Sequence, residues 1–197
     1  MYQNRSVKLG KSLEFPAPMR KATTTPENHL HDQEARWFAV YTRYKREKLV
    51  GRHLAQKGIE YYLPLQHFTR RYQRKVKQVD LPLINCYIFV RIRKSQYVPV
   101  LETADVVEFV QFNRNLIAIP EAEIDLLRRI VGEIEAVEVN PASLAKGDQV
   151  EVIGGQLTGL KGTLLEKRGQ HKLVIALETL GYDLHMEVNP SHIRKMV

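Results

Sequence analysis

The stretch that decides the fold of the C-terminal part of this chain is Lys146-Gly-Asp-Gln-Val-Glu-Val-Ile-Gly-Gly-Gln-Leu-Thr-Gly-Leu-Lys-Gly-Thr-Leu-Leu165. Val150 and Val152 alternate with other residues, which predicts a short strand with both valines on one face. Glycines then follow at turn positions where the backbone can adopt a positive φ, and they are Gly155, Gly159 and Gly162. Apolar residues 164–165 resume strand character, so the stretch predicts a β-hairpin around a glycine-rich connection.

The rest of the C-terminal part has the same short-strand pattern. Residues 172–177 and 182–188 are rich in apolar side chains and predict two further strands, joined by a turn at Gly181. Residues 191–196 predict a last edge strand. Five short strands in a segment of about fifty residues predict a small SH3-like barrel.

The spacing of glycines and valines in this stretch resembles the KOW motif, which is found in NusG-type transcription factors and in some ribosomal proteins. The residues that carry the resemblance are Gly147, Val150, Val152, Gly155, Gly159 and Gly162. Several fixed spacings over about twenty residues make the motif fairly specific for a fold, and less specific for a function. A glycine-rich hairpin in an unrelated small barrel is the alternative interpretation.

The composition is that of a soluble protein of one or two domains. The chain has 197 residues, no apolar run long enough for a membrane span and no signal-peptide core, so we expect a cytoplasmic protein with no membrane partner. Its single cysteine, Cys86, excludes an internal disulfide and a cysteine-based zinc site. His29 and His31 stand in a polar stretch without an obvious third ligand, so we expect exposed side chains there and no metal.

Basic residues are concentrated in one region. Lys and Arg outnumber Asp and Glu by 16 to 6 in residues 36–119, whereas the ratio is 5 to 4 in residues 1–35 and 7 to 6 in residues 145–197. Residues 120–144 are acidic, at 2 to 6. This local excess predicts a polyanionic partner, most simply nucleic acid. General solubilisation is the alternative, but it explains the asymmetry less well.

The order of elements in the larger domain follows from local patterns. Residues 1–35 have few apolar residues in any period, which predicts a mobile tail. The first ordered element is a predicted strand over residues 36–41, and Thr42 is expected to cap a helix that runs to about Lys57. A second strand is predicted over residues 59–65.

Residues 66–79 carry the densest run of positive charge. The run has no acidic residue, and its basic residues are Arg70, Arg71, Arg74, Lys75 and Lys77. So many like charges cannot be buried, which predicts a hairpin that reaches into solvent. On charge alone, a solvated loop without a partner is an equal alternative.

Residues 84–92 predict the most informative strand of this domain. Period-two alternation gives a core face made of Ile84, Cys86, Ile88, Val90 and Ile92. Tyr87 and Phe89 lie on the other face between polar residues, which favours a half-exposed apolar patch for a partner. A helix that covers both aromatic residues and makes them core is the alternative.

The remaining elements complete an α+β chain. Residues 95–103 predict a short helix capped by Ser95, residues 106–112 predict a strand, and Pro120 is expected to begin a helix with an acidic first turn. The predicted organisation is a mobile tail at 1–35, an antiparallel sheet with flanking helices at 36–132, a linker at 133–145 and the all-β barrel at 146–197.

This order resembles the N-terminal domain of the NusG family. The segments that stand in the family's order are Trp37–Tyr41, Glu47-Lys48, Gly58-Ile59, Leu63-Pro64, Pro82-Leu83, Tyr87–Val90 and Val106–Phe112. Within the family the chain is most similar to specialised paralogues such as RfaH and the UpxY regulators of capsular polysaccharide operons. The resemblance implies an RNP-like N-terminal domain that binds the clamp of bacterial RNA polymerase. It also implies a tethered KOW domain that recruits other factors, such as a ribosomal protein or a termination factor.

The resemblance assigns two sets of residues. The set implied to bind RNA polymerase is Tyr87, Phe89 and Phe112. Near the helix start that meets non-template DNA in RfaH-like members stand Arg43, Lys45 and Arg46. The hairpin residues expected to join them on non-template DNA or nascent RNA are Arg70, Arg71, Arg74 and Lys75.

Three features depart from the family pattern. Asn85-Cys86 stands where the family commonly has Pro-Gly, Tyr97–Val100 does not reproduce the His-Thr-Thr contact to the polymerase gate loop known in RfaH, and the tail is longer than usual. No phosphate loop, nucleophile elbow or metal-ligand cluster is present, so we expect no enzyme activity and no cofactor. The predicted function is elongation and antitermination of specific long operons. A KOW-containing ribosomal or general RNA-binding protein is the alternative.

Overall fold

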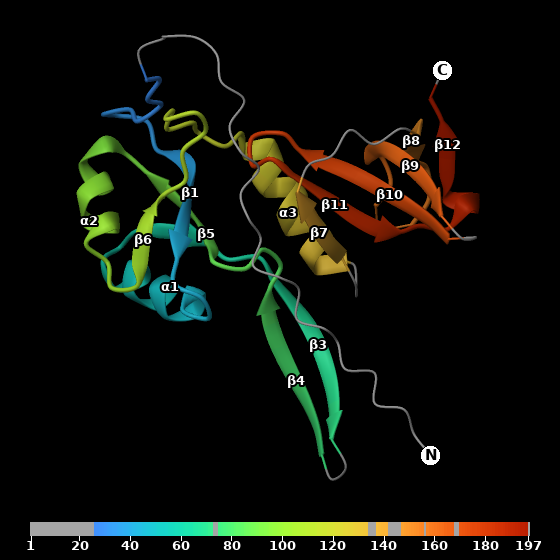
Figure 1. Cartoon of the computed structure of the whole chain (residues 1–197), viewed down its shortest axis with the longest axis horizontal. Helices are drawn as coiled ribbons and strands as arrows, with labels where there is room; N and C mark the ends of the chain where they lie inside the picture. Colours follow the sequence, from blue (N-terminus) through green and yellow to red (C-terminus); the bar gives the residue numbers. More distant parts are fainter. Residues whose placement is uncertain are drawn as a thin grey trace.

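The computed structural model of the chain describes residues 26–72, 75–133, 137–141, 147–155, 157–167 and 170–196. They form an N-terminal domain around a four-stranded antiparallel sheet, a two-stranded hairpin that projects from it, and a C-terminal six-stranded sheet (Figure 1). This architecture confirms the α+β class and the all-β C-terminal part that the sequence predicts. Among the helices in the described residues, none has the length and apolar character needed to span a bilayer.

The N-terminal sheet has the strand order β2-β5-β1-β6. Its strands are β1 (Arg36–Thr42), β2 (Glu60–Tyr62), β5 (Tyr87–Ile92) and β6 (Val106–Phe109). The two central strands, β1 and β5, consist mainly of aromatic and β-branched residues, which suit a pleated surface that is buried on both sides. They pair in antiparallel register from Arg36 opposite Ile92 to Tyr41 opposite Tyr87.

Two helices cover the first face of this sheet. They are α1 (Glu47–Gln56) and α2 (Tyr97–Leu101), the second of which follows a 3₁₀ turn at Lys94–Gln96. Val50 and Leu54 lie four residues apart on one side of α1, and both are fully buried. They share one core cluster with the aliphatic residues of β5, which are Ile88, Val90 and Ile92.

A third helix, α3 (Glu121–Glu133), covers the opposite face. Its Ile124, Leu127 and Ile130 recur at helical spacing and are fully buried, as a helix that starts after Pro120 requires. They share a core cluster with residues of the second sheet face, which are Trp37, Ala39, Tyr87 and Phe89. The sheet is therefore enclosed on both sides.

The basic segment forms the hairpin that the sequence predicts. Strands β3 (Leu65–Tyr72) and β4 (Lys75–Pro82) pair in one unbroken antiparallel register. Figure 1 shows the hairpin extending well beyond the two domains. Arg74, and the side chains of Arg70, Arg71 and Lys75, lie outside the described residues, so their predicted contacts stay a prediction.

The C-terminal strands assemble in the order β12-β8-β9-β10-β11-β7. Their bounds are β7 (Val137–Pro141), β8 (Asp148–Val152), β9 (Lys161–Lys167), β10 (Gln170–Leu177), β11 (Tyr182–Glu187) and β12 (Ile193–Lys195), with a 3₁₀ turn at Pro190–His192 before β12. Val150 and Val152 are both buried, which confirms the predicted strand face. The five predicted strands correspond to β8 through β12.

The glycines of the KOW-like stretch have two different roles. Gly155 and Gly159 have φ of 77° and 86°, so they supply the positive φ that the sequence predicts. Gly162 does not, because it lies inside β9 opposite Val150. A Cβ atom at Gly162 would lie 2.4 Å from the carbonyl oxygen of Val174, so this position needs glycine for the close approach of β10.

The predicted linker is partly wrong. Residues 137–141 form β7, which pairs with β11 from Tyr182 opposite Pro141 to Met186 opposite Val137. The only local signal was the alternation of Val137 and Val139, which is too short to distinguish a strand from a connection. As a result β7 begins four residues after α3 ends.

Several element boundaries also differ from the predictions. Thr42 is the buried last residue of β1 and not a helix cap, because its N–H donates to the Cys86 carbonyl and continues the sheet. Helix α1 begins later, after Arg46. Strand β5 begins at Tyr87, so Ile84 lies before it and packs with the aromatic face instead of the predicted aliphatic face.

Two further predictions fail near α2 and β6. Ser95 lies inside the 3₁₀ turn and caps no helix. Strand β6 ends at Phe109 and does not reach Phe112. Asn113 and Arg114 both have positive φ, and Phe112 exchanges backbone hydrogen bonds with Asn115, which defines a tight type I′ turn that ends the extended chain.

Candidate functional site

Tyr87 lies at the contact between the two domains. Its side chain is 4% exposed, and its ring meets Tyr41 at 5.7 Å and Tyr182 of β11 at 5.8 Å, both edge to face. The Tyr182 hydroxyl donates to the Tyr87 hydroxyl at 3.3 Å. Burial, followed by the hydrogen bond with Tyr182, raises the pKa of Tyr87 well above its usual range.

Phe89 is covered more completely. It is fully buried and stacks on Tyr62 with ring centroids 6.3 Å apart. The guanidinium of Arg128 on α3 lies 5.4 Å from the centroids of both Trp37 and Tyr62, so a cation caps the aromatic cluster. Burial raises the pKa of Tyr62 to about 12, although the nearby Arg128 acts in the opposite direction.

The predicted half-exposed patch is therefore wrong in this arrangement of the chain. Tyr87 and Phe89 do lie on the face opposite the aliphatic residues, as the alternation predicts, but both are buried. The alternative interpretation, in which a helix covers them, describes the structure because α3 packs there. Their contact with RNA polymerase stays a prediction.

Polar contacts connect α3 to the C-terminal domain. Oε1 of Glu123 accepts hydrogen bonds from the Thr179 hydroxyl at 2.7 Å and from the Thr179 N–H at 3.2 Å. Arg129 donates to the Thr158 carbonyl at 2.6 Å. Thr158 belongs to the glycine-rich connection of the KOW-like stretch, so both that connection and the turn before β11 contact the N-terminal domain.

Phe112 and the basic residues of the β1–α1 loop are the other members of the two predicted sets whose side chains the structure describes. Phe112 is partly buried in its tight turn and is not part of the aromatic cluster of Tyr87 and Phe89. The three basic residues of the loop between β1 and α1 are exposed, and these are Arg43, Lys45 and Arg46. The structure thus does not bring the predicted polymerase-binding residues into a single patch.

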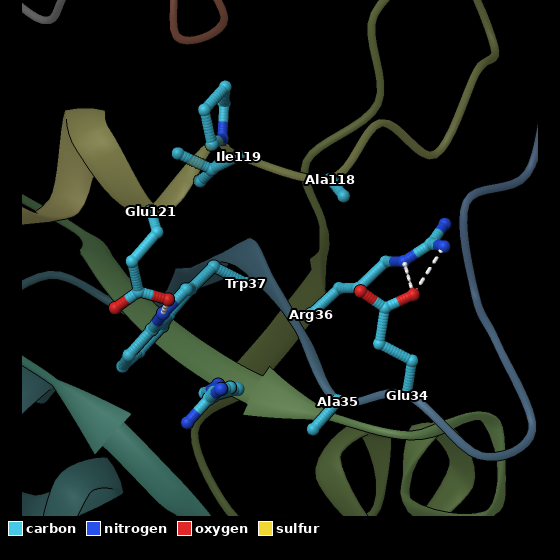
Figure 2. Close-up of a pocket in the computed structure, with 9 residues that line it drawn as sticks. Glu34, Ala35, Arg36, Trp37, Ala118, Ile119 and Glu121 are labelled. Atoms are coloured by element: carbon cyan, nitrogen blue, oxygen red, sulfur yellow. Dashed lines mark hydrogen bonds and ion pairs between the residues drawn. The ribbon is translucent and has the colours of Figure 1, made fainter.

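An open cleft of about 380 Å³ lies at the end of the sheet where β1 begins. Figure 2 shows Trp37 and Glu121 on one side of it and the Glu34–Arg36 pair on the other. Trp37 Nε1 donates to Glu121 at 2.8 Å, and Arg36 donates to Glu34 at 2.6 Å. Both carboxylates that line the cleft therefore already accept a hydrogen bond from a neighbouring lining residue.

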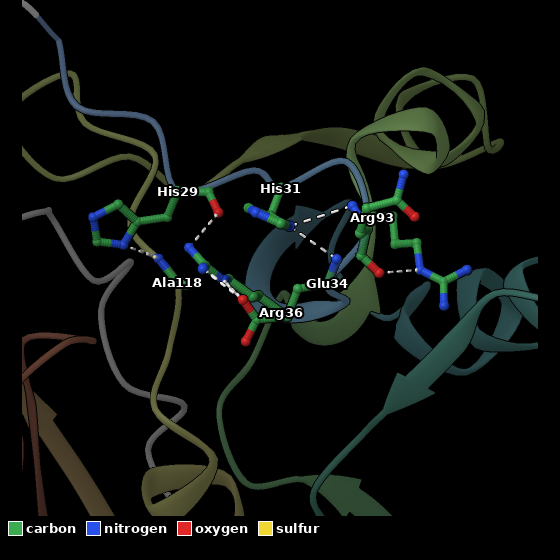
Figure 3. Close-up of polar contacts among 7 residues, drawn as sticks. His29, His31, Glu34, Arg36, Arg93 and Ala118 are labelled. Atoms are coloured by element: carbon green, nitrogen blue, oxygen red, sulfur yellow. Dashed lines mark hydrogen bonds and ion pairs between the residues drawn. The ribbon is translucent and has the colours of Figure 1, made fainter.

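Residues 26–35, predicted to belong to a mobile tail, instead pack on the N-terminal domain. His29 N–H donates to the Leu116 carbonyl, and the Lys94 N–H donates to the His31 carbonyl. Figure 3 shows how side chains add to this contact. His29 Nδ1 accepts the Ala118 N–H at 3.1 Å, and Arg36 donates to the His29 carbonyl at 3.2 Å. Residues 1–25 of the predicted tail lie outside the described residues.

The two histidines therefore have structural partners. His31 is exposed, as expected, and its Nδ1 accepts the N–H groups of Gln33 and Glu34, whereas His29 is half-buried. Glu34 pairs with Arg36, and this hydrogen bond lowers the pKa of its carboxyl. In the described part of the chain, no three His, Cys, Asp or Glu side chains are placed to hold a metal ion.

Comparison with known proteins identifies the N-terminal domain. Residues 35–128 match the family model described as "Transcription termination factor nusG". The match covers β1 through most of α3, including the sheet and all three helices that pack on it. Residues 35–128 are therefore a NusG-family domain, which agrees with the resemblance in the sequence.

Two solved structures have similarity to the chain. The chain is similar to a structure described as "Domain interaction in Thermotoga maritima NusG", with 19% identity, a TM-score of 0.53, and coverage of 83% of this chain and 98% of that chain. At this identity the match supports the fold alone. A chain of the MjSpt4:Spt5 complex in conformation A matches with 18% identity over 81% of this chain and 97% of that chain, at a TM-score of 0.27.

Sequence reasoning missed the residues that join the two domains. Glu123, Arg129, Thr179 and Tyr182 were assigned no role in a contact between domains, because no local pattern distinguishes them from ordinary surface residues. Tyr182 lies 95 residues from Tyr87 in the chain, so no local pattern relates them. The only available signal was the aromatic content of the two segments.

Proposed function

We propose that the protein is a transcription elongation factor that binds the clamp of bacterial RNA polymerase and promotes processive transcription and antitermination of specific long operons. Specialised NusG paralogues such as RfaH and UpxY are its expected functional relatives, and capsular polysaccharide operons are its expected targets. The observation that carries the proposal is the NusG-family domain, in which one small sheet carries an aromatic face and an adjacent exposed cationic loop.

The protein acts in this proposal as a bridge between the clamp and nucleic acid. A domain that holds the mobile clamp by an apolar face and nucleic acid by a basic face resists clamp opening, because opening breaks one set of contacts. Each set can be weak on its own, since the second contact forms at high effective concentration once the first is made. The exposed basic loop and the projecting hairpin extend from the same domain, and this supports simultaneous contact.

Polymerase binding through Tyr87 requires that its cover be removed. In the structure, the two domains are in contact, and we call this the closed arrangement. Tyr182 packs edge to face against the Tyr87 ring, and Glu123 and Arg129 of α3 bind the C-terminal domain through hydrogen bonds. We infer that the C-terminal domain moves away when the protein loads.

Release would serve a second purpose. The connection that contains Thr158 faces α3 in the closed arrangement, so it becomes available to another factor only when the domains separate. A ribosomal protein or a termination factor is the expected partner of the C-terminal domain. Polymerase binding and recruitment of this partner are then coupled, since both require the open arrangement, in which the two domains are separated.

The function is tested by deleting the gene and measuring transcripts along its target operon. We expect promoter-distal transcripts to fall much more than promoter-proximal ones, because lost processivity accumulates with distance. Complementation with the intact gene is the control. An equal loss along the whole operon would identify an initiation regulator instead.

Co-purification separates the proposal from its alternative. A tagged protein is expected to retain polymerase subunits after nuclease treatment, which removes contacts made only through nucleic acid. Retention of intact ribosomes or free RNA without polymerase would support a KOW-containing ribosomal or RNA-binding protein.

A further inference from the structure

The loop between β1 and α1 is a tight turn with an unusual residue at its bend. The Arg46 N–H donates to the Arg43 carbonyl at 3.0 Å, which closes a four-residue turn. Lys45, at the third position, has φ of 62°, whereas Tyr44 does not have a positive φ. This combination defines a type II turn, whose third position normally needs glycine. Tyr44 therefore occupies the second position of a turn whose backbone conformation is unfavourable for the lysine at its third position.

Neighbouring segments hold this turn in place. Cys86 and Asp105, which lie just before β5 and β6, also have positive φ, at 66° and 68°. The Arg43 N–H donates to the Asp105 carbonyl at 2.9 Å. The Cys86 N–H donates at 2.8 Å to Glu47, whose carboxylate is buried at the start of α1. Three strained backbone positions at one end of a sheet cost energy, and such clusters occur where a site must be held rigid.

The turn presents one aromatic ring among cations. Tyr44 is 53% exposed, more than the other exposed tyrosine of the described residues, Tyr61, at 36%. Lys45 Nζ lies 5.0 Å from the centroid of the Tyr44 ring. Arg43, Lys45 and Arg46 are all exposed beside it, and Arg43 forms an ion pair with Asp105 at 3.8 Å. The surface is thus strongly cationic, with an accessible π-face at its corner.

This combination is the chemistry that binds single-stranded nucleic acid. Cations alone attract any phosphate backbone, single-stranded or duplex. An exposed ring adds no stacking contact with a duplex, because the bases of a duplex are already stacked on each other. An unpaired base can stack on such a ring, and each stacked base contributes a large share of the affinity in single-strand binders. A rigid turn keeps the ring in position, which reduces the entropy lost on binding.

We propose that Tyr44 is a base-stacking residue for single-stranded nucleic acid, whose flanking phosphates are neutralised by Arg43, Lys45 and Arg46. The inference rests on the nucleic-acid contact of this loop in the proposed function, and it adds the residue and the kind of contact that select unpaired strands over duplex. DNA and RNA present the same base faces, so the experiment includes both.

The test compares the full chain with Tyr44→Ala and Tyr44→Phe variants. Fluorescence anisotropy at low salt measures binding to labelled DNA and RNA strands of about 16 nucleotides and to the matching DNA duplex. We expect Tyr44→Ala to weaken single-strand binding about tenfold, with duplex binding changed less than about twofold, and Tyr44→Phe to retain most of the affinity. Tyr61→Ala, which removes another exposed tyrosine, is the matched control and should bind normally.

A spectroscopic readout identifies stacking directly. A strand that carries 2-aminopurine should lose fluorescence beyond its free value when the wild type binds, and this quenching should disappear in Tyr44→Ala and persist in Tyr44→Phe. Thermal unfolding of each variant checks that the turn is folded. Unchanged single-strand affinity in folded Tyr44→Ala, equal losses for strand and duplex, or no single-strand binding by the wild type would overturn the inference.

The outcomes also separate this inference from the proposed function. If the protein fails to bind polymerase but shows Tyr44-dependent stacking, the function is wrong and the inference stands. If Tyr44→Ala impairs only polymerase binding, with normal strand binding and quenching, Tyr44 contacts protein and the inference is wrong.

Discussion

The two faces of the N-terminal sheet are buried by different means. The first face is aliphatic, with Ile88, Val90 and Ile92 fully buried under α1 and α2 of the same domain. The second face is aromatic, with Trp37, Tyr87 and Phe89 buried under α3, and Tyr87 also meets the C-terminal domain. Only the second face therefore depends on how two domains are arranged.

This difference separates a permanent core from a surface that can exchange partners. Burial of purely aliphatic side chains stabilises a fold but does not select a particular partner. Aromatic side chains that carry a hydroxyl or an indole N–H can form part of a core or of an interface. On the second face, the hydroxyl of Tyr87 and the indole N–H of Trp37 have hydrogen-bond partners. A partner that supplies equivalent apolar and polar contacts can replace the C-terminal domain there.

The largest expected effect is on the first face. Ile88→Ala removes a fully buried side chain that no domain movement can relieve, so we expect a loss of about 3 kcal/mol in the free energy of unfolding. Urea unfolding monitored by the single tryptophan, Trp37, reports on this domain. Val107→Ala, at a position 50% exposed on β6, is the control and should cost less than about 0.5 kcal/mol. A comparably small loss for Ile88→Ala would remove the contrast between the faces.

The next effect is on polymerase binding by the second face. Tyr87→Ala should weaken binding by about 2 kcal/mol, close to 30-fold, if Tyr87 anchors the interface. Titration of polymerase with the labelled protein measures this, with circular dichroism as a check of folding. Tyr61→Ala is the matched control, because Tyr61 is a 36% exposed tyrosine on β2 that belongs to neither predicted set. Normal binding by folded Tyr87→Ala would defeat the assignment.

Local sequence patterns predicted the faces of the sheet but not what covers them. The alternation in β5 separates Ile88 and Val90 from Tyr87 and Phe89, because the strand period is independent of the rest of the chain. Burial of the aromatic pair depends on α3 and on Tyr182, which are distant in sequence. A half-exposed patch and a covered one have the same local pattern, so the sequence left both open.

Boundaries failed where distant hydrogen bonds compete with local preference. Thr42 is a good helix cap by residue type, but the Cys86 carbonyl draws its N–H into the sheet. The turn at Tyr44 was also missed, because Lys45 gives no hint of a positive φ. The strands β8 through β12 of the C-terminal sheet were predicted well, since valine alternation and glycine turns are local signals.

A smaller effect is expected from loosening the contact between the domains. Thr179→Val removes the hydroxyl that donates to Glu123, which should weaken the closed arrangement by about 1 kcal/mol. Apparent affinity for polymerase should then rise up to about fivefold, because more of the protein is open. Ser191→Ala removes a hydroxyl that donates to Asn189 within the C-terminal domain, and it should change nothing. Weaker binding by Thr179→Val would mean that the closed arrangement helps polymerase binding.

The effect expected to be smallest at neutral pH is a pH dependence that originates on the second face. Burial raises the pKa of Tyr62 to about 12, whereas an unfolded chain has a tyrosine pKa of about 10. Its contribution to stability is therefore complete below pH 10 and is lost as pH rises toward 12, because the unfolded state releases the proton first. In the described residues the Tyr62 hydroxyl is buried and has no hydrogen-bond partner, so Tyr62→Phe should be nearly neutral at pH 8. From pH 10 to 11.5, urea unfolding followed by Trp37 fluorescence should show a less steep loss of stability in Tyr62→Phe than in the wild type. Parallel curves would indicate that Tyr62 ionises freely in the folded protein, and that the aromatic face is open to solvent even without a partner.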